Sequence, residues 1–247
     1  MALGLYFICF IIFSFMGWIY ESIYCTIRTH HWDNRGFLFG PICPIYGTGA
    51  VVATLVFNEI FKNGEAKLWQ IFLISMLGSA VIEFVTSYVL EKLFHAVWWD
   101  YSEVPFNIQG RICLPASIGF GIAGIFVVKY ISPAVFGLFV DVPPLVIEGI
   151  AMILIAVLGA DLALTVSGLT ELVKKMEEMG ADKVNSIYIG DSEVDIQTAK
   201  NAGIPCISVL WGFKDRKFLE DSGAMAIVES MEELGERLVN YQKSQNN

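Results

Sequence analysis

Residues 143–167 read PPLVIEGIAMILIAVLGADLALTVS, a stretch with two acidic residues and no basic one. A bilayer core of about 30 Å is crossed by roughly 20 apolar residues in a helix. The stretch is therefore long enough to span a membrane. Pro143 and Pro144 suit its start, because the first helical turn does not need their missing N–H groups. Near residue 170 the composition changes, and a charged sequence typical of soluble proteins follows.

Earlier apolar runs have the same character, and we expect spans at residues 5–26, 41–61, 69–90 and 112–132. Residues 133–140 either form a re-entrant piece or extend the fourth span. No basic segment precedes the first run, so we interpret it as a retained span and not as a signal peptide. The sequence thus predicts a mainly α fold, a polytopic transmembrane bundle of about five helices, followed by a small α/β segment.

Composition agrees with a membrane protein. Of the 247 residues 55% are hydrophobic and 17% charged, and the mean hydropathy is +0.59, whereas soluble domains carry about 25% charged residues. The net charge of −9 gives no electrostatic basis for nucleic-acid binding. The cysteines are odd in number and lack metal-ligand spacing, so we expect reduced thiols and no zinc site. They are Cys9, Cys25, Cys43, Cys113 and Cys206.

The basic residues favour one orientation slightly. With five spans and a cytoplasmic C-terminus, the cytoplasmic side holds Arg28, Arg35, Lys92 and Arg111. The opposite side then holds Lys62, Lys67 and Lys129. This small excess follows the positive-inside rule, and Lys174 and Lys175 directly after the last span strengthen it. We therefore expect a multi-pass protein of the cell membrane with a cytoplasmic tail.

Acids lie inside the expected spans at Glu21, Glu83, Glu148 and Asp161. An acid at the bilayer centre costs about 2.5–3.5 kcal/mol, so such residues usually face a cavity or a partner. Glu21 and Asp161 lie near span ends and could instead reach water, whereas Glu83 and Glu148 favour a polar interior. Arg35 and Arg111, with Arg28, are the available counter-ions. Carboxylate–arginine pairs between helices could serve as structural contacts or as part of a solute path.

The first two pairs of spans share a faint pattern. Glu21 lies late in the first span and Glu83 lies within the third, and a Trp-Asp pair follows each, at 32–33 and 99–100. The second helices open with GPICP at 40–44 and GRICLP at 110–115. Two helices per unit would make the copies parallel, as in some transporters. The alternative is that Gly, Pro and Trp simply recur in membrane proteins, and the sequence leaves both interpretations open.

Four stretches, taken together and in order, resemble a family of small bacterial integral membrane proteins that is labelled as ABC-transporter permeases of the CmpB type. They are GWIYES at 17–22, NRGFLFGP at 34–41, LFHAVWWDYS at 93–102 and FNIQGRIC at 106–113. The resemblance covers about residues 5–172. It implies a transport function but supplies no substrate. The chain has no Walker sequence, so an ATPase subunit would be a separate chain.

The tail alternates strands and helices. Strands are expected at 186–190, 206–211 and 224–228, with helices ending near Gly203, at 215–222 and at 230–242. This order predicts a parallel sheet whose strand ends carry the ligand site. Asp191 and Asp195 follow the first strand, and two carboxylates there could hold Mg²⁺ through oxygen ligands.

The stretch GDSEVDIQTAKNAGIP at 190–205, continued by WGF at 211–213, resembles phosphoglycolate phosphatases of the haloacid-dehalogenase (HAD) type over about residues 176–243. The resemblance implies that Asp191 binds Mg²⁺ and that Asp195 supports or ligates it. That family attacks phosphate with an Asp of an Asp-x-Asp motif. No Asp-x-Asp-Gly sequence occurs here, so we assign no catalytic residue.

We therefore expect a membrane domain over 1–172, a junction over 173–183 and a partial HAD-like segment over 184–247. The function expected is that of a permease-like membrane protein with a catalytically incomplete tail. The alternative is a membrane-tethered Mg²⁺-dependent phosphatase. Three interpretations of the tail compete: a fusion remnant, an interaction module, or half of an enzyme that another chain completes. We favour the fusion remnant.

Overall fold

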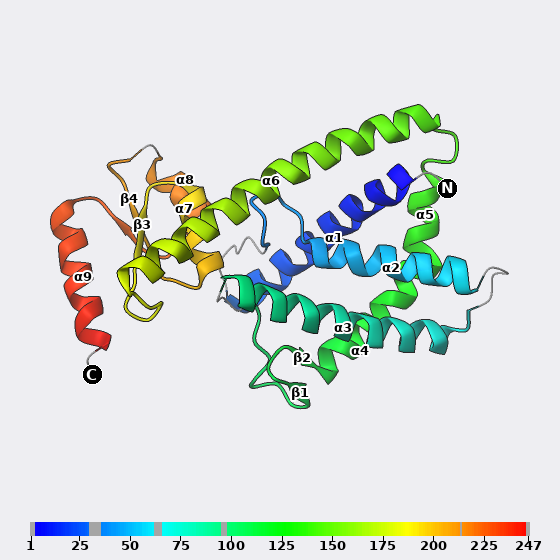
Figure 1. The fold of residues 1–247 in the computed structure, drawn as a ribbon, viewed down its shortest axis with the longest axis horizontal. Coiled ribbons are helices and arrows are strands. Elements are labelled where there is room, and N and C mark those ends of the chain that lie inside the picture. Colours follow the sequence, from blue (N-terminus) through cyan, green and yellow to red (C-terminus); the bar gives the residue numbers. More distant parts are fainter. Residues whose placement is uncertain (1–2, 30–35, 62–65, 95–97, 213, 246–247) are drawn as a thin grey trace. The chain divides into compact units, whose positions relative to one another are not determined.

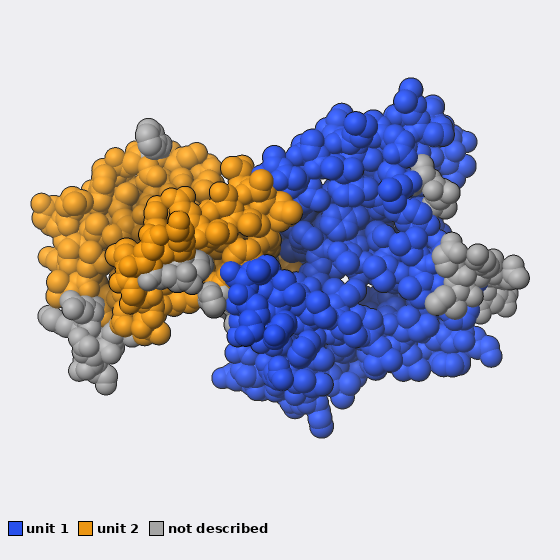
Figure 2. Space-filling model, viewed as in Figure 1, with its two compact units in different colours: residues 1–20, 40–93, 99–161 blue, residues 21–39, 94–98, 162–247 orange. Residues whose placement is uncertain are grey.

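The computed structural model describes residues 3–29, 36–61, 66–94, 98–212 and 214–245. The chain forms two compact units (Figure 2). The membrane unit comprises residues 1–20, 40–93 and 99–161, and the tail unit comprises residues 21–39, 94–98 and 162–247. The fold is mainly α with a small α/β segment, as the sequence predicts. The tail unit also takes in two loops from the amino-terminal part of the chain.

Long apolar helices dominate the chain (Figure 1). They are α1 Leu3–Thr29, α2 Pro44–Ile60, α3 Leu68–Phe94, α4 Leu114–Phe126, α5 Ser132–Gly137 and α6 Pro144–Met179. A π-helical turn, Val127–Ile131, joins α4 to α5. Four stretches are long and apolar enough to cross a membrane: Leu3–Ile27, Leu68–Phe94, Leu114–Gly137 and Pro144–Met176.

The structure revises two of the expected spans. The span expected at 41–61 is the 17-residue helix α2, which begins at Pro44 because residues 37–41 form bends. At 1.5 Å per residue it is about 26 Å long, shorter than a typical bilayer core. The span expected at 143–167 continues to Met179, so the junction expected at 173–183 is helical for most of its length. Residues 133–140 extend the fourth span through α5 and form no re-entrant piece within residues 132–137.

The extension of α6 has a simple physical basis. Lys175 Nζ lies 2.6 Å from Glu171 Oε1, and Lys174 Nζ lies 3.8 Å from Glu178 Oε1. Pairs four residues apart stabilise a helix once it is in water. The helix ends before Gly180, whose φ of +62° is readily adopted by glycine.

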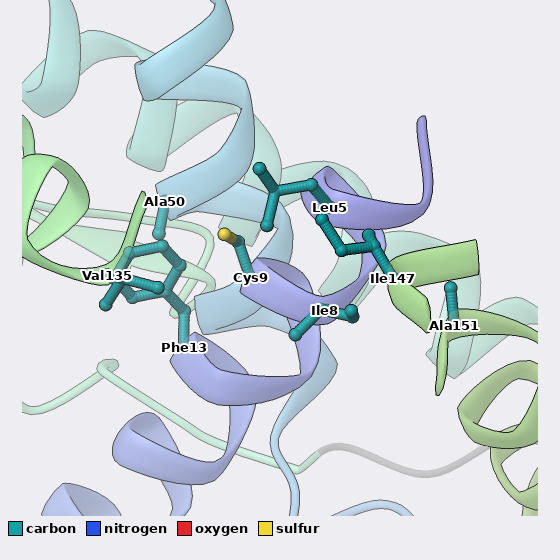
Figure 3. Packing of buried hydrophobic residues seen from close by; sticks show 8 residues of the cluster. All are labelled: Leu5, Ile8, Cys9, Phe13, Ala50, Val135, Ile147 and Ala151. Carbon is teal, nitrogen blue, oxygen red and sulfur yellow. The ribbon is translucent and has the colours of Figure 1, made fainter. Parts of the chain in front are cut away.

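The core of the membrane unit lies where four helices meet (Figure 3). The buried residues come from α1, α2, α5 and α6, and they are Leu5, Ile8, Cys9, Phe13, Ala50, Val135, Ile147 and Ala151. Next to this cluster, Thr54 Oγ1 and Ser132 Oγ are 2.8 Å apart, so the two hydroxyls share a hydrogen bond between α2 and α5. Such a bond satisfies both hydroxyls where water is absent.

Helices α1 and α2 approach closely at small residues. A Cβ atom added to Gly47 would lie 2.1 Å from Ser14 Oγ and 2.4 Å from the Phe10 carbonyl oxygen. A Cβ atom added to Gly17 would lie 2.3 Å from the Tyr46 ring. Close backbone approach at glycine is a common way to pack helices in lipid, because dispersion contacts then replace the missing hydrophobic force.

In the tail, the strands β3 Tyr188–Gly190, β4 Cys206–Val209 and β5 Ile227–Val228 form a parallel sheet in the order β3-β4-β5. The helices are α7 Glu193–Ala202, α8 Arg216–Asp221 and α9 Met231–Gln245. All six elements lie where the sequence predicts them. Helix α7 ends at Gly203 in the left-handed conformation, with φ of +68°. The sheet packs Ile207, Val209 and Val228 against Leu234 of α9.

Candidate functional site

One face of α3 carries a group of polar residues in the membrane unit. Glu83, Ser87 and Glu91 are four residues apart and therefore lie on one side of the helix. Glu83 is 5% exposed, and its Oε1 accepts a hydrogen bond from the Tyr101 hydroxyl at 3.4 Å. This contact gives the acid expected to be deepest in its span a polar partner.

Arg111 faces the same side of α3. Its Nη2 forms an ion pair with Glu91, and its Nη1 donates to Ser87 Oγ at 3.1 Å. The guanidinium also lies over the rings of Phe84 and Tyr88, 5.9 and 5.6 Å from their centroids. Arginine is the cation suited to such combined pairing and stacking. Because its side chain is only 15% exposed, Arg111 is held largely out of solvent.

A short hairpin positions Arg111. The strands β1 Asn107–Ile108 and β2 Ile112–Cys113 pair in antiparallel fashion, and the turn between them places Gly110 at φ +67°. The Trp99 indole donates to the Arg111 carbonyl at 2.9 Å. A Cβ atom at Gly110 would lie 2.6 Å from Asp100 Oδ1, so this turn requires glycine on both counts.

The other intramembrane candidates are spread over the molecule. Glu148 Oε1 accepts from the Gly4 N–H at 3.4 Å, at the first turn of α1. Asp161 Oδ2 accepts from the Gly40 N–H at 2.8 Å. Glu21 Oε2 accepts from the Cys25 thiol at 3.9 Å. Arg35 lies outside the described residues. Among those that the structure describes, the acids thus have separate contacts and form no common cluster.

Two of these contacts are made to backbone N–H groups, one at the start of a helix and one in a loop. Glu148 meets the positive end of the α1 dipole, where an anion is favourable. Asp161 holds the backbone of the bend before α2. Glu148 is more than a third exposed and lies early in α6, and the polar interior expected around it stays a prediction.

Sequence reasoning missed Glu91, Ser87 and Tyr101. The spacing Glu83–Ser87–Glu91 was the available signal, because positions four apart on an apolar helix form a polar stripe. Arg111 was proposed as a counter-ion for the span acids, and the structure pairs it with Glu91 at the end of α3 instead.

In the tail, the loop after β3 carries Asp191 and Asp195. Asp195 Oδ2 accepts from the N–H groups of Asp191 and Ser192, each at 3.1 Å, and from Ser192 Oγ at 2.7 Å. Ser192 Oγ in turn accepts from the Asp195 N–H at 3.4 Å. This reciprocal arrangement is a capping box for α7. Asp195 therefore serves first as a helix cap.

Asp191 lies beside a glycine of the next loop. A Cβ atom at Gly212 would lie 2.0 Å from Asp191 Oδ2, so the backbone after β4 passes directly over the carboxylate. Magnesium uses one or two carboxylates with several waters and phosphate oxygens. With Asp195 engaged by three donors and Asp191 covered at Gly212, these two residues do not by themselves fit a magnesium ion. We derive no chemical step through one.

Burial changes two acid–base groups near this loop. Burial raises the pKa of the Cys206 thiol to about 11. Burial and the neighbouring Asp195 carboxylate raise the pKa of the Tyr188 phenol. Both groups are therefore neutral at physiological pH, and neither has the lowered pKa that marks an activated nucleophile.

The tail is similar to known phosphatases over a limited region. A family model described as HAD-hydrolase-like matches residues 169–234. The phosphoglycolate phosphatase of Mesorhizobium japonicum is 37% identical over 71 residues, 28% of this chain and 31% of that protein. The phosphoglycolate phosphatase of Pseudomonas syringae pv. syringae is 38% identical over 53 residues, 21% of this chain and 20% of that protein. The chain thus spans less than a third of the length of either relative.

A crystal structure from Lactobacillus delbrueckii subsp. bulgaricus, of a protein assigned as a phosphoglycolate phosphatase, is 39% identical in sequence. The match covers 28% of this chain and 29% of that one, with a TM-score of 0.28. The similarity between the two is therefore one of sequence over a short region.

The remainder of the chain matches a different family. A family model described as "Putative ABC-transporter type IV" (CmpB) matches residues 8–166, which is more than half of the chain. This range contains most of α1, all of α2 to α5, most of α6, and the Glu83 and Arg111 contacts. By this match the chain belongs to the CmpB family of ABC-transporter type IV proteins.

Proposed function

We propose that the chain is a membrane-embedded, permease-like subunit whose tail lies in the cytosol and is not catalytic by itself. The observation that carries the proposal is the set of four apolar helices within the family match. The family match supplies no substrate, so the proposal names none.

The polar face of α3 supports a transport role. Glu83 and Arg111 are charged groups at the edge of a membrane-length helix, and such residues usually mark a functional path. They are held in place by contacts with Tyr101, Ser87 and Glu91. Because Glu83 is 5% exposed and the Arg111 side chain 15% exposed, this polar stripe is suited to line a path between helices.

An ATPase partner follows from the family and from the sequence. The chain has no Walker sequence of its own, so ATP hydrolysis would require another subunit. Gentle detergent extraction of native membranes should co-purify an ATP-hydrolysing protein. If repeated purifications, with cross-linking before extraction, contain no ATPase activity above that of mock membranes, the partner is excluded and a different role is required.

Membrane insertion and orientation are tested separately. The protein should stay in the pellet of a high-speed spin and be released only by detergent. A reporter that fluoresces only in the cytosol, fused after residue 245, should be active. A reporter that works only on the other side of the membrane, fused at the same place, should be inactive. The opposite pair of results would place the tail on the side of the membrane away from the cytosol.

A second candidate function is a membrane-tethered Mg²⁺-dependent phosphatase. The similarity of the tail to proteins named phosphoglycolate phosphatase favours it. The full-length protein would then hydrolyse phosphoglycolate or another phosphomonoester with Mg²⁺, and Asp191→Asn would abolish the hydrolysis. Because the attacking Asp motif is absent from the sequence, we expect no turnover above the Asp191→Asn background.

A further inference from the structure

Helix α7 buries polar side chains as well as the apolar one that packs in the tail core. Ile196 of α7 packs with Leu219 and Ile227 in the tail core. Gln197 is 7% exposed and Asn201 is 2% exposed. Amides are rarely buried to this degree unless they are hydrogen-bonded. Their burial therefore indicates that something outside the α/β segment covers this face of α7.

Two loops of the amino-terminal part, both within the tail unit, supply that cover. Gln197 Nε2 donates to the Gly36 carbonyl at 3.0 Å. Asn201 Nδ2 donates to the Phe37 carbonyl at 3.0 Å. Buried backbone carbonyls outside helices and sheets need such partners, so each amide satisfies a group of the loop that leads to α2.

The second loop follows α3. Asn201 Oδ1 accepts from the Trp98 indole at 3.4 Å and from Gln197 Nε2 at 2.9 Å. Asn201 therefore uses both its donor and its acceptor, Gln197 donates twice through Nε2, and the bond between them lets each position the other. Asn201 thus joins the two loops through a single side chain.

Aromatic packing completes the contact. The Phe37 ring lies 5.8 Å from Phe94 and 5.5 Å from Trp98, and Phe94 and Trp98 are 6.0 Å apart. Leu38 is 1% exposed. A closed cluster of three rings contributes beyond its buried area, and the amides lie beside it.

We propose that α7 is an amide clamp: Gln197 and Asn201 hold the Gly36 and Phe37 carbonyls and the Trp98 indole, and so order residues 36–39 and Trp98. These loops carry two of the four sequence stretches by which the chain resembles its family, NRGFLFGP and LFHAVWWDYS. If the clamp holds these segments, the tail is a structural component of the protein, whether or not it takes part in catalysis. The proposal does not depend on transport or on phosphatase activity.

The test is amide hydrogen exchange of the full-length protein in detergent. In Gln197→Ala/Asn201→Ala, exchange of peptides covering residues 36–39 should rise by about tenfold or more, since this segment loses both of its side-chain hydrogen bonds to α7. Trp98→Phe keeps an aromatic ring in the cluster and removes the indole N–H donor, so it should give a smaller rise in the same peptides. Asn240→Ala, at an exposed position of α9, is the matched amide control and should change nothing.

Peptides from β4 and α7 report whether the tail stays folded. Faster exchange at 36–39 with a protected β4 supports the clamp. Unchanged exchange at 36–39 overturns it, whether or not β4 stays protected, because the loops then keep their order without the amides. If β4 loses protection together with the loop in the double variant, Trp98→Phe decides: a rise at 36–39 supports the clamp, and none overturns it.

Discussion

The Tyr188 hydroxyl donates a hydrogen bond to Asp195 Oδ1 at 3.3 Å, so a strand residue is bonded to the cap of the helix that follows it. Burial, and then the charge of Asp195, raise the pKa of the Tyr188 phenol. The bond joins β3 to the first turn of α7.

This contact predicts a pH dependence for the tail. Because the folded pKa of Tyr188 lies above its unfolded value of about 10, its contribution to stability is complete below that pH. The contribution is lost as pH rises through the folded pKa. The difference in ultraviolet absorbance between the parent and Tyr188→Phe reports the ionisation of Tyr188. In a pH titration this ionisation should occur at a higher pH than that of an ordinary tyrosine. Ionisation at or below pH 10 would contradict the burial.

Removal of the Asp195 carboxylate separates capping from metal binding. Asp195→Ala should lower the free energy of unfolding of the tail by about 1 kcal/mol, because the capping box is lost. Thermal melts should show the same loss with and without Mg²⁺. If Mg²⁺ stabilises the parent but not Asp195→Ala, the carboxylate is a metal ligand after all. Glu193→Ala, which removes an acid of the same turn outside the capping box, is the control.

Helix packing in the membrane unit predicts a sharp contrast between two glycines of α2. Gly47→Ala places a methyl group against Ser14 and the Phe10 carbonyl, so we expect a loss of about 1–3 kcal/mol or more from overpacking. Gly49→Ala meets nothing within 4 Å and should be neutral or slightly stabilising. Thermal unfolding in detergent measures both. Equal effects of the two substitutions would contradict the close approach of α1 and α2.

The Arg111 contacts predict that lysine cannot replace arginine. Arg111→Lys keeps the charge but loses the planar group that bonds Ser87 and stacks on Phe84 and Tyr88. We expect a stability loss of about 1–2 kcal/mol, since hydrogen bonds to charged groups are among the stronger ones. Lys67→Ala, at an exposed position, serves as the control in the same melting assay. A lysine variant as stable as the parent would show that only the charge matters.

The sequence predicted the elements of the tail well, because each is bounded by a strong local signal. Gly203 ends α7, and the Ser192–Asp195 spacing starts it. The sequence also located the apolar helices, since length and hydropathy are local properties. It failed on the end of α6, where charged residues continue the helix through Glu171–Lys175 pairing. Hydropathy cannot distinguish a helix that leaves the membrane from one that stops.

The contacts of the polar residues could not be predicted in the same way. Asp161 meets the Gly40 N–H, and Glu148 meets that of Gly4, across more than a hundred residues of sequence. The partners are backbone groups, which every residue has, so no residue type indicates them. The sequence did not indicate the contacts of Gln197 and Asn201 for the same reason, because these side chains donate to backbone carbonyls.

The π-helical turn at Val127–Ile131 has a consequence for the packing of the residues after it. A π turn holds one more residue than an α turn, and such bulges often mark functional positions. Loss of a single residue there would leave a regular helix but rotate everything after it by about 100°. Val135 would then leave the core that it forms with residues of α1, α2 and α6, so this packing depends on the extra residue of the π turn.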